Sequence, residues 1–338
     1  MFSSAEESYE SAVWELRGKF GRDLQIERIG PDLGVLPVSK PQVKAVAEAC
    51  DRQPLVFIRH LTVERARVPR DEAEDVEAVV AAALNIAAED AVAHALALQI
   101  WVSGSPKTGW TSGELHQRLS AALESRGITV SRSGQKRVLS CCVTEHGVLI
   151  GSNLLVHSIS DWPGGRVRLA RSEDMISRAE FKLEELFQLL PIELPQGGRA
   201  ADLGASPGGW TRVLRQRGLA VWAVDPGELD PRVAADPQVH HARTTAGEFF
   251  RSGPNMFDVI VNDMRMDPVK SCRVMLDAAR RLHPDGLAIM TLKTGIHRPA
   301  EVVERCLSLL EREYRVEYAR QLHHNRHEVT VVLSPLSY

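Results

Sequence analysis

A short segment near the middle of the chain, Asp202–Trp210 (DLGASPGGW), constrains the fold most strongly. It follows the apolar Ala200-Ala201 and runs into a helical pattern. A strand, a glycine-containing turn and a helix N-terminus, in this order, form a site for an anionic or carboxylate-bearing ligand. The acid, the glycines and the proline coincide within this span, which favours a ligand site over the alternative, an ordinary strand-to-helix turn in an α/β domain.

The glycine spacing indicates which ligand the turn would bind. A dinucleotide site has the pattern G-x-G-x-x-G, which lets backbone amides approach a pyrophosphate. Here the glycines are Gly204, Gly208 and Gly209, and Pro207 fixes the turn. This spacing fits S-adenosyl-L-methionine better, because its amino-acid end carries no pyrophosphate.

The length and composition predict a soluble protein of two domains, with room for a small third module. Hydrophobic residues make up 44% and charged residues 25% of the 338 residues, which allows a large core. No apolar run reaches the roughly 18 residues that a membrane helix needs. Because Met1–Glu7 has neither a basic region nor an apolar core, we do not expect a secretion signal.

The cysteines and the net charge restrict cofactors and partners. The five cysteines form no C-x-x-C pair and no zinc spacing, which is typical of a reducing compartment and predicts a cytoplasmic protein without a metal. A net charge of −3 is not that of a general nucleic-acid binder, so RNA binding would depend on local patches. One basic stretch contains Arg126, Arg132, Lys136 and Arg137. This stretch could bind RNA phosphates or form a solvated face of a hairpin, and the sequence favours neither interpretation.

The first half of the chain predicts an N-terminal α/β, ferredoxin-like segment (residues 1–70) and a compact α/β module (residues 71–158). Neither contains a catalytic constellation. In the segment we expect helices over Ala5–Lys19 and Pro41–Ala49 and a buried strand over Leu55–Ile58. In the module, Thr111 and Glu114 form a capping box. The elements predicted there are helices Asp71–Ala88 and Leu115–Ser125 and strands Ala95–Val102, Ile128–Ser131, Val138–Thr144 and Val148–Ile150.

Residues 159–172 contain Pro163-Gly164-Gly165 and are expected to be a linker, followed by a second α/β domain at residues 173–338. Its first helix should span Ser177–Phe187, with a capping box of Ser177 and Glu180 and with Phe181 on the core face. Strand and helix patterns then alternate, which is the signature of a mostly parallel sheet. The predicted strands are Ala200–Leu203, Ala220–Val224, Phe257–Asn262 and Leu287–Leu292, the helices Thr211–Arg217, Pro268–Leu282 and Ala300–Glu313, and the closing edge hairpin Arg315–Gln321 and Glu328–Leu333.

Three charged residues end predicted strands at the carboxyl edge of this sheet, where such sheets bind ligands. Asp225 lies about 20 residues beyond Gly204, where an acid can accept both ribose hydroxyls of an adenosine. The alternative is a turn residue before Pro226. Asp263 and Lys293 end the next two strands. A lysine at the end of an apolar strand has little structural reason to be there, unless it has simply reached solvent.

Five segments of the second domain resemble the FtsJ-like ribose 2′-O-methyltransferases. They are most similar to RlmM-type enzymes, which methylate a cytidine ribose of large-subunit ribosomal RNA and carry a THUMP RNA-binding module before the methyltransferase. The resemblance is specific over Ser177–Leu333 and only architectural before it. It implies a Rossmann-like domain with a mostly parallel seven-stranded sheet, a THUMP-like module at residues 71–158, S-adenosyl-L-methionine as cofactor and RNA as partner. The segments are Ser177-Arg178-Ala179 with Lys182, the Asp202–Trp210 loop, Asn262-Asp263-Met264, Leu292-Lys293 and Glu328-Val329-Thr330.

The resemblance also implies site residues. A catalytic tetrad would consist of Lys182, Asp263, Lys293 and Glu328. Where relatives often place an acid near the adenine, this chain has Thr244–Gly247, so Thr245 takes that position. The implied cofactor-binding residues are Ser177, Asp202, Gly204, Ser206, Pro207, Gly208, Gly209, Trp210, Asp225, Thr245 and Asp263.

Two lysines suit this reaction. A ribose hydroxyl is a poor nucleophile, so a general base has to take its proton as it attacks the sulfonium methyl. An ordinary lysine, with a pKa of about 10.4, is mostly charged at neutral pH. Burial, the Lys182 cation and the sulfonium would all favour a neutral Lys293. Asp263 and Glu328 oppose this effect, so we assign them to holding the lysines and the ribose in place.

Two other functions stay open at this point. The first is a methyltransferase of another substrate, such as another RNA, a base or a small molecule. A base amino-methylating enzyme should carry Asn/Asp-Pro-Pro-aromatic where this chain has Asn262–Arg265, which disfavours it. The second is a non-catalytic RNA-binding protein that retains the fold, but all four tetrad residues are present. The reaction needs no metal, and His323, His324 and His327 lie too close to a hairpin bend to form a convincing ligand set. We expect these histidines, with Arg320 and Arg326, to face RNA or solvent.

Overall fold

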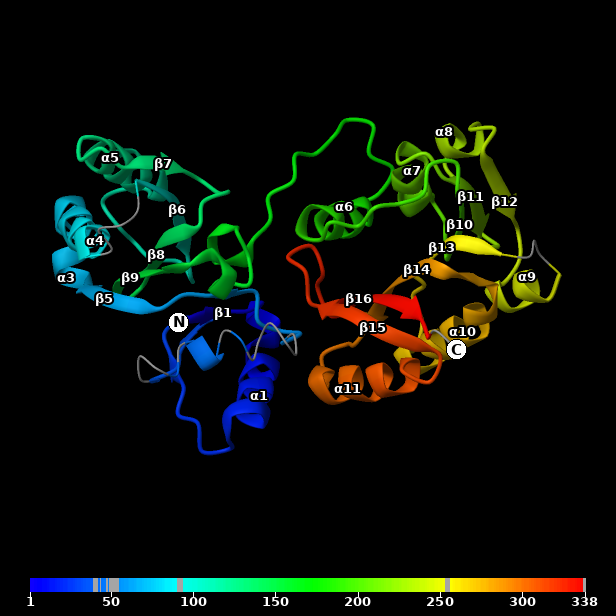
Figure 1. The fold of residues 1–338 in the computed structure, drawn as a ribbon, viewed down its shortest axis with the longest axis horizontal. Coiled ribbons are helices and arrows are strands. Elements are labelled where there is room, and N and C mark those ends of the chain that lie inside the picture. The colour runs from blue at the N-terminus through cyan, green and yellow to red at the C-terminus, as the bar shows by residue number, and fades with distance from the viewer. Residues whose placement is uncertain are drawn as a thin grey trace. The chain divides into compact units, whose positions relative to one another are not determined.

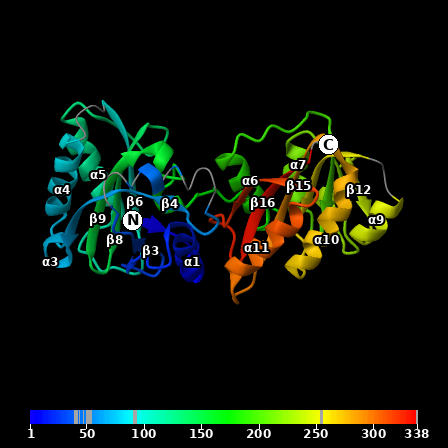
Figure 2. The same ribbon diagram turned by 60° about the horizontal axis from the view of Figure 1, so that its bottom comes forward.

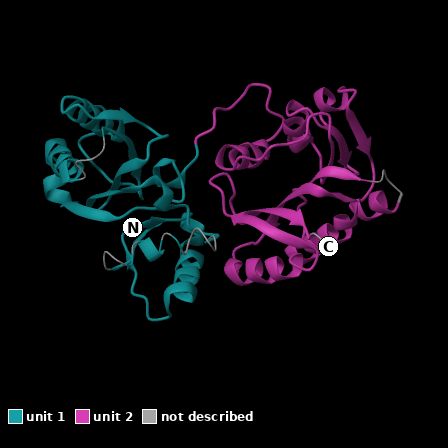
Figure 3. Cartoon of the chain, in the orientation of Figure 1, with its two compact units in different colours: residues 1–167 teal, residues 168–338 magenta. Residues whose placement is uncertain are grey.

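The computed structural model of the chain describes residues 1–38, 42, 44–46, 48, 55–89, 94–252 and 256–336. The chain divides into two compact units, Met1–Val167 and Arg168–Tyr338 (Figure 3). The helix expected over Pro41–Ala49 lies largely outside the described residues. Within those residues, every helix is too short or too polar to cross a membrane.

The first unit begins with a small antiparallel sheet in the order β2-β3-β1-β4. Residues 55–58 are buried as expected, but they do not form a strand. The backbone amides of Val56 and Phe57 instead donate to the carboxylate of Glu15 on α1 (2.9 Å each). The elements are β1 (Phe2–Ser3), α1 (Tyr9–Phe20), β2 (Glu27–Arg28), β3 (Leu33–Val35) and β4 (His60–Leu61).

The rest of this unit is built on a five-stranded sheet in the order β5-β9-β8-β6-β7. Successive side chains of a strand point to opposite faces. Cys141 of β8 therefore packs beneath α4 and α5, while Cys142 packs with Trp101 and Leu33 on the other face. The elements are β5 (Glu64–Pro69), α3 (Arg70–Ala73), α4 (Val76–Glu89), β6 (Ala95–Val102), α5 (Ser112–Glu124), β7 (Thr129–Ser131), β8 (Arg137–Thr144) and β9 (Gly147–Leu154).

Two local predictions for this sheet have different outcomes. The capping box at α5 is confirmed on the Thr111 side, because Thr111 Oγ1 accepts from the backbone N–H of Glu114 (3.1 Å). The single helix expected over Asp71–Ala88 is wrong, because the chain breaks between α3 and α4. There the Asp75 carboxylate accepts from the backbone N–H of Glu77 (3.0 Å) and starts a second helix.

Residues 155–167 belong to the first unit, although the sequence predicted a linker over residues 159–172. A Cβ atom added to Gly164 would lie 2.8 Å from the ring of Trp101, and Val167 is fully buried. Arg166 forms an ion pair with Asp32. The boundary between the units therefore follows Val167. This segment contains two 3₁₀ turns, Leu155–His157 and Pro163–Gly165.

The second unit is built on a seven-stranded sheet in the order β12-β11-β10-β13-β14-β16-β15. The first five strands are parallel, and β16 is antiparallel to β14 and β15. The mostly parallel sheet and its closing edge hairpin are thus confirmed. The strands are β10 (Arg199–Leu203), β11 (Ala220–Val224), β12 (Val239–Ala242), β13 (Phe257–Asn262), β14 (Leu282–Lys293), β15 (Tyr314–Arg320) and β16 (Glu328–Pro335).

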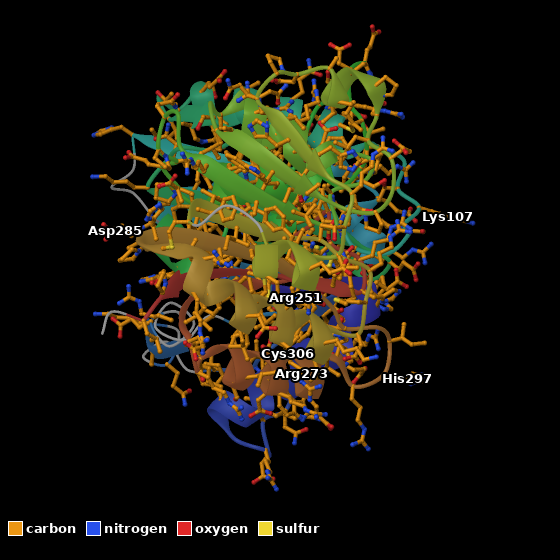
Figure 4. All side chains as sticks on the ribbon, turned by 90° about the vertical axis from the view of Figure 1, so that its right-hand side faces the viewer. Lys107, Arg251, Arg273, Asp285, His297 and Cys306 are labelled. Atoms are coloured by element: carbon orange, nitrogen blue, oxygen red, sulfur yellow. The ribbon has the colours of Figure 1, made fainter. Side chains whose placement is uncertain are left out.

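Helices cover both faces of this sheet, with α6 and α7 on one face and α10 and α11 on the other (Figure 1). Leu183 and Val213 of the first pair pack against the strands. Figure 2 shows the second pair side by side. There the thiol of Cys272 faces the backbone carbonyl of Cys306, which is labelled in Figure 4, and both residues are buried. The helices are α6 (Glu180–Leu189), α7 (Gly209–Gln216), α8 (Pro231–Ala234), α9 (Ala246–Ser252), α10 (Pro268–Ala278) and α11 (Pro299–Leu310).

The start of α6 differs from the prediction. The helix begins at Glu180, and the Glu180 carboxylate accepts from the backbone N–H groups of Ile176 (2.6 Å) and Ser177 (3.2 Å). The reciprocal bond of a capping box is missing, because the buried Oγ of Ser177 has no hydrogen-bond partner among the described residues. Phe181 does not belong to the core face. It stacks on His324, with ring centroids 4.9 Å apart.

Candidate active site

A cleft of about 1690 Å³ opens at the carboxyl ends of the parallel strands. The strand order reverses between β10 and β13, and this switch point is where open α/β sheets bind ligands. The cleft is lined by all four tetrad residues and by most of the glycine loop. The site residues expected from the sequence that line the cleft are Ser177, Lys182, Asp202, Gly204, Ser206, Pro207, Gly209, Trp210, Asp225, Thr245, Asp263, Lys293 and Glu328.

Two glycines of the loop are required by close contacts. Gly204 has φ +80°, and a Cβ atom there would lie 2.6 Å from Cγ of Met264. A Cβ atom on Gly209, the first residue of α7, would lie 2.3 Å from Oγ of Ser177. The unpartnered Ser177 hydroxyl and the N-terminus of α7 therefore meet at the cleft wall, where the hydroxyl can bind the polar amino-acid end of a ligand.

Two acids of the cleft are held by the protein itself. The Asp225 carboxylate accepts from the backbone N–H groups of Ser206 (3.2 Å) and Gly227 (2.7 Å), which joins the glycine loop to the end of β11. Asp202 is buried and accepts from Thr211 Oγ1 (2.7 Å). Burial raises the pKa of Asp202 to about 7, so its charge at neutral pH depends on what binds beside it.

The four tetrad side chains meet in one cluster. Lys182 Nζ lies 3.0 Å from each carboxylate oxygen of Asp263 and 2.9 Å from Oε2 of Glu328. Lys293 Nζ lies 2.5 Å from Oδ1 of Asp263 and also pairs with Oε2 of Glu328. Thr291 completes the cluster, because its hydroxyl bonds to Asp263 Oδ1 (2.5 Å) and to Lys293 Nζ (2.8 Å).

The fold brings these residues together through strand register. Asp263 directly follows β13, and Lys293 ends the neighbouring β14. Glu328 begins β16 and is the register partner of Lys293 in the antiparallel pair. Lys182 enters from α6, in the first turn of the helix.

Two members of the cluster, Lys182 and Asp263, keep their charges although they are largely buried. Burial alone would lower the pKa of Lys182, but the carboxylates of Asp263 and Glu328 outweigh it and raise this pKa. Burial alone would raise the pKa of Asp263, but Lys293 and Lys182 outweigh it and lower this pKa. Lys182 is therefore a fixed ammonium at neutral pH, and its side chain is only 11% exposed.

Three predicted cofactor residues have other contacts. Gly208 does not line the cleft and approaches Val233 instead, 3.0 Å from where its Cβ would lie. Trp210 lines the cleft, but its indole N–H donates to the carbonyl of Ala179 (2.8 Å), and its ring packs in the core. Thr245 caps the start of α9 by exchanging hydrogen bonds with Glu248.

Sequence reasoning missed part of the cleft wall, because it placed Phe181 in the core and gave Arg178 and Arg265 no role in the site. It predicted that His324 and Arg326 face RNA or solvent, and both line the cleft. Phe181, Met264 and His324 line the cleft, and so do four exposed arginines. None of these arginines forms an ion pair with another described residue. They come from three separate segments, so no single stretch of sequence shows their charge. They are Arg171, Arg178, Arg265 and Arg326.

No group of three or more His, Cys, Asp or Glu side chains in the described residues could hold a metal ion. His323 and His324 are held by the protein instead: their backbone N–H groups donate to the carboxylate of Glu185 on α6. The bend between β15 and β16 is therefore joined to the helix that carries Lys182.

The model of the FtsJ-like methyltransferase family matches residues 175–337 of this chain. These residues form an FtsJ-like methyltransferase domain. The match includes the tetrad, the glycine loop and both strands of the closing hairpin. The cofactor of the domain is S-adenosyl-L-methionine, as the spacing of the glycines predicted.

The curated relatives described here are all named ribosomal RNA large subunit methyltransferase M. The protein of Halorhodospira halophila is 42% identical over 174 residues, which is 50% of this chain and 50% of the relative. That of Methylococcus capsulatus is 38% identical over 191 residues, 52% of each chain. That of Alkalilimnicola ehrlichii is 35% identical over 228 residues, 63% of this chain and 61% of the relative. The chain thus spans about half to three fifths of the length of these relatives.

Proposed function

We propose that the protein is an S-adenosyl-L-methionine-dependent RNA 2′-O-ribose methyltransferase that modifies a cytidine of large-subunit ribosomal RNA. The observation that carries the proposal is the cluster of Lys182, Asp263, Lys293 and Glu328 in the same cleft as the glycine loop. The names of the relatives support the choice of ribosomal RNA. The choice of a cytidine rests on the resemblance to RlmM-type enzymes.

Lys293 is the general base in this proposal. Its side chain is 21% exposed, more than that of Lys182, so its Nζ is the more accessible amine of the cluster. When bound, S-adenosyl-L-methionine supplies an electrophilic methyl carbon on a sulfonium. Lys293 takes the proton of the ribose hydroxyl as the oxygen attacks, and an ammonium remains, which Asp263 and Glu328 stabilise.

Lys182 has a different role, because its carboxylate contacts keep it charged. As a fixed cation it balances Asp263 and Glu328, which would otherwise hold the proton on Lys293. It also fixes both carboxylates in place. Alignment of hydroxyl, methyl carbon and sulfur then supplies much of the rate.

The four exposed arginines at the cleft support an RNA substrate. The acids that line the same cleft are either buried, bonded to backbone amides or paired with the two lysines. The arginine charges are therefore available for phosphates on both sides of the target nucleotide. This local patch provides the RNA affinity that a net charge of −3 does not. In the first unit, Arg126, Arg132 and Lys136 form a second candidate phosphate contact.

The experiment is methyl transfer to large-subunit ribosomal RNA transcripts by the purified protein, followed by mapping of the methylated nucleotide and of the methylated atom. We expect one ribose 2′-O-methylcytidine, and no product with Lys293→Ala. RNA affinity, measured without cofactor, should fall as the salt concentration rises. The fall should be less steep in the triple variant Arg171→Gln, Arg265→Gln, Arg326→Gln, because its binding releases fewer counterions.

A matched control for that variant is Arg315→Gln. Arg315 is exposed and lies near the start of β15, at the opposite end of the sheet from the cleft. Methylation of a base, or of no RNA at all, would contradict the proposed function. An unchanged salt slope in the triple variant would show that the arginines do not contact phosphates.

A further inference from the structure

Glu185 is a buried carboxylate for which the proposed mechanism has no use. It lies on α6 one turn after Lys182 and is 1% exposed. Its oxygens accept from the backbone N–H groups of His323 (2.7 Å) and His324 (2.8 Å), and Nδ1 of His324 lies 2.6 Å away. A charge in the interior is tolerated only where hydrogen bonds replace its hydration. These bonds hold the β15–β16 bend against α6.

The same bend is also fixed to the strand that carries Lys293. Thr294 directly follows that lysine and donates both its backbone N–H and its hydroxyl to the carbonyl oxygen of His327 (3.0 Å each). Within the bend, Oδ1 of Asn325 accepts from the backbone N–H of Leu322 (2.9 Å). The bend is therefore a defined loop that is attached to both lysine-bearing elements.

Glu328 is the next residue after His327 and begins β16. Its Oε2 lies 2.9 Å from Nζ of Lys182 and pairs with Nζ of Lys293. The register of β16 on β14 fixes Glu328 relative to Lys293, whereas the bend connects it to α6. If Glu185 released the bend, Glu328 would stay with β14, and its contact with Lys182 would loosen.

We propose that Glu185 is a positioning residue of the active site. Through the bend it fixes Glu328 between the two lysines, and so it sets the geometry of proton removal without touching the cofactor or the RNA. The proposal rests on the function proposed above. It explains why a carboxylate is buried at this point of α6, where an apolar residue would otherwise suffice.

The test compares Glu185→Gln with Glu184→Gln. The first substitution keeps the shape of the side chain but turns an amide N–H group toward a bend that offers N–H donors. Glu184 is the adjacent residue on α6 and pairs with Arg217 (2.7 Å), which does not line the cleft. Its variant removes the same charge from the same helix and is the matched control.

We expect single-turnover methylation to slow by about tenfold or more in Glu185→Gln, because small displacements of catalytic groups are costly. The rate should reach half its maximum at a different pH, because Glu328 is no longer held between the lysines. Affinity for S-adenosyl-L-methionine should stay within about twofold of the wild type, because Glu185 lines no part of the cleft. Glu184→Gln should behave as the wild type.

Hydrogen exchange of residues 321–330 gives a readout that does not depend on activity. Glu185→Gln should exchange faster there than Glu184→Gln. Equal exchange in the two variants would overturn the role of Glu185 in fixing the bend, even if the wild type methylated no RNA and the proposed function failed. With an active wild type, an unchanged rate, or a parallel loss of cofactor affinity and rate, would overturn the positioning role.

Discussion

Each of the two units contains a cluster of polar side chains, and the two clusters are built differently. In the first unit, Nε2 of His60 lies 3.1 Å from Oε1 of Gln99, and its Nδ1 lies 3.1 Å from the hydroxyl of Thr62. The Thr62 hydroxyl reaches Ser140 on β8 (3.4 Å). Burial lowers the pKa of His60 to about 4, so this cluster is neutral at physiological pH.

In the second unit the cluster consists of two lysines and two carboxylic acids. Lys182, Asp263, Lys293 and Glu328 pair with one another, and the pKa shifts of Lys182 and Asp263 both favour the charged forms. The neutral cluster is buried, whereas the charged cluster lines an open cleft. The comparison teaches that a polar cluster can serve packing where it is buried, whereas a cluster that lines a cleft can exchange a partner with a substrate.

The largest expected effect is on the rate of methyl transfer, which should depend on the cluster of the second unit. Lys293→Ala should reduce methyl transfer by about a thousandfold, because the general base is removed. Cofactor affinity and folding should be nearly unchanged, since Lys293 sits at the end of a strand whose core side chains remain. Calorimetry with S-adenosyl-L-methionine and thermal unfolding provide the controls. Substantial remaining activity would place the base elsewhere.

The cluster of the first unit should affect folding stability and not activity. The pKa of His60 is about 4 in the folded protein and 6.5 when unfolded, so the unfolded chain binds the proton first as the pH falls. His60 should therefore cost about 2 kcal/mol of stability between pH 7.5 and pH 5. Denaturant titrations at both pH values test this. His60→Gln should weaken that pH dependence and leave methyl transfer at pH 7.5 unaffected. An identical pH dependence in the variant would show that His60 is protonated in the folded state.

The two lysines should also differ from each other. Lys182→Ala removes the fixed cation and leaves both carboxylates to Lys293, so the rate should fall by about ten- to a hundredfold. The pH optimum should rise, because the proton is then held more firmly on Lys293. Rate against pH for the wild type and the variant is the measurement. A pH optimum that stays constant or falls would remove the electrostatic role of Lys182.

A smaller effect is expected at the buried acid beside the glycine loop. Burial raises the pKa of Asp202 to about 7, and a cationic ligand favours the ionised carboxylate. Affinity for S-adenosyl-L-methionine should therefore increase by about tenfold from pH 6 to pH 8. Asp202→Asn should remove this dependence. Equal pH dependence in the wild type and the variant would show that Asp202 does not respond to the ligand.

The sequence predicted the parts of the second unit that obey a regular pattern. Strand–helix alternation placed β10, β11 and β13 within one residue, and charged residues at strand ends indicated where ligands bind. The resemblance, rather than periodicity, selected Lys182 and Glu328, because their approach depends on the docking of α6 and the register of β16. Tertiary contacts of this kind leave no local signal.

The elements that were missed show the same limit. Strand β12 has the sequence Val-His-His-Ala, which lacks an apolar run. The strand expected over Leu55–Ile58 was wrong because Glu15, distant in sequence, takes its amide hydrogen bonds. Likewise, Glu185 has the sequence appearance of a solvated helix residue, and only the folded hairpin shows that it is buried.

The most direct test of the central claim is single-turnover methylation of large-subunit ribosomal RNA against pH by Lys293→Arg, with folding and cofactor binding checked separately. The guanidinium keeps the positive charge beside Asp263 and Glu328 but cannot lose its proton at any usable pH. If Lys293 removes the proton of the ribose hydroxyl, this variant is nearly as inactive as Lys293→Ala at every pH. Near-normal activity of Lys293→Arg would show that the site needs only a cation there and that lysine is not the base.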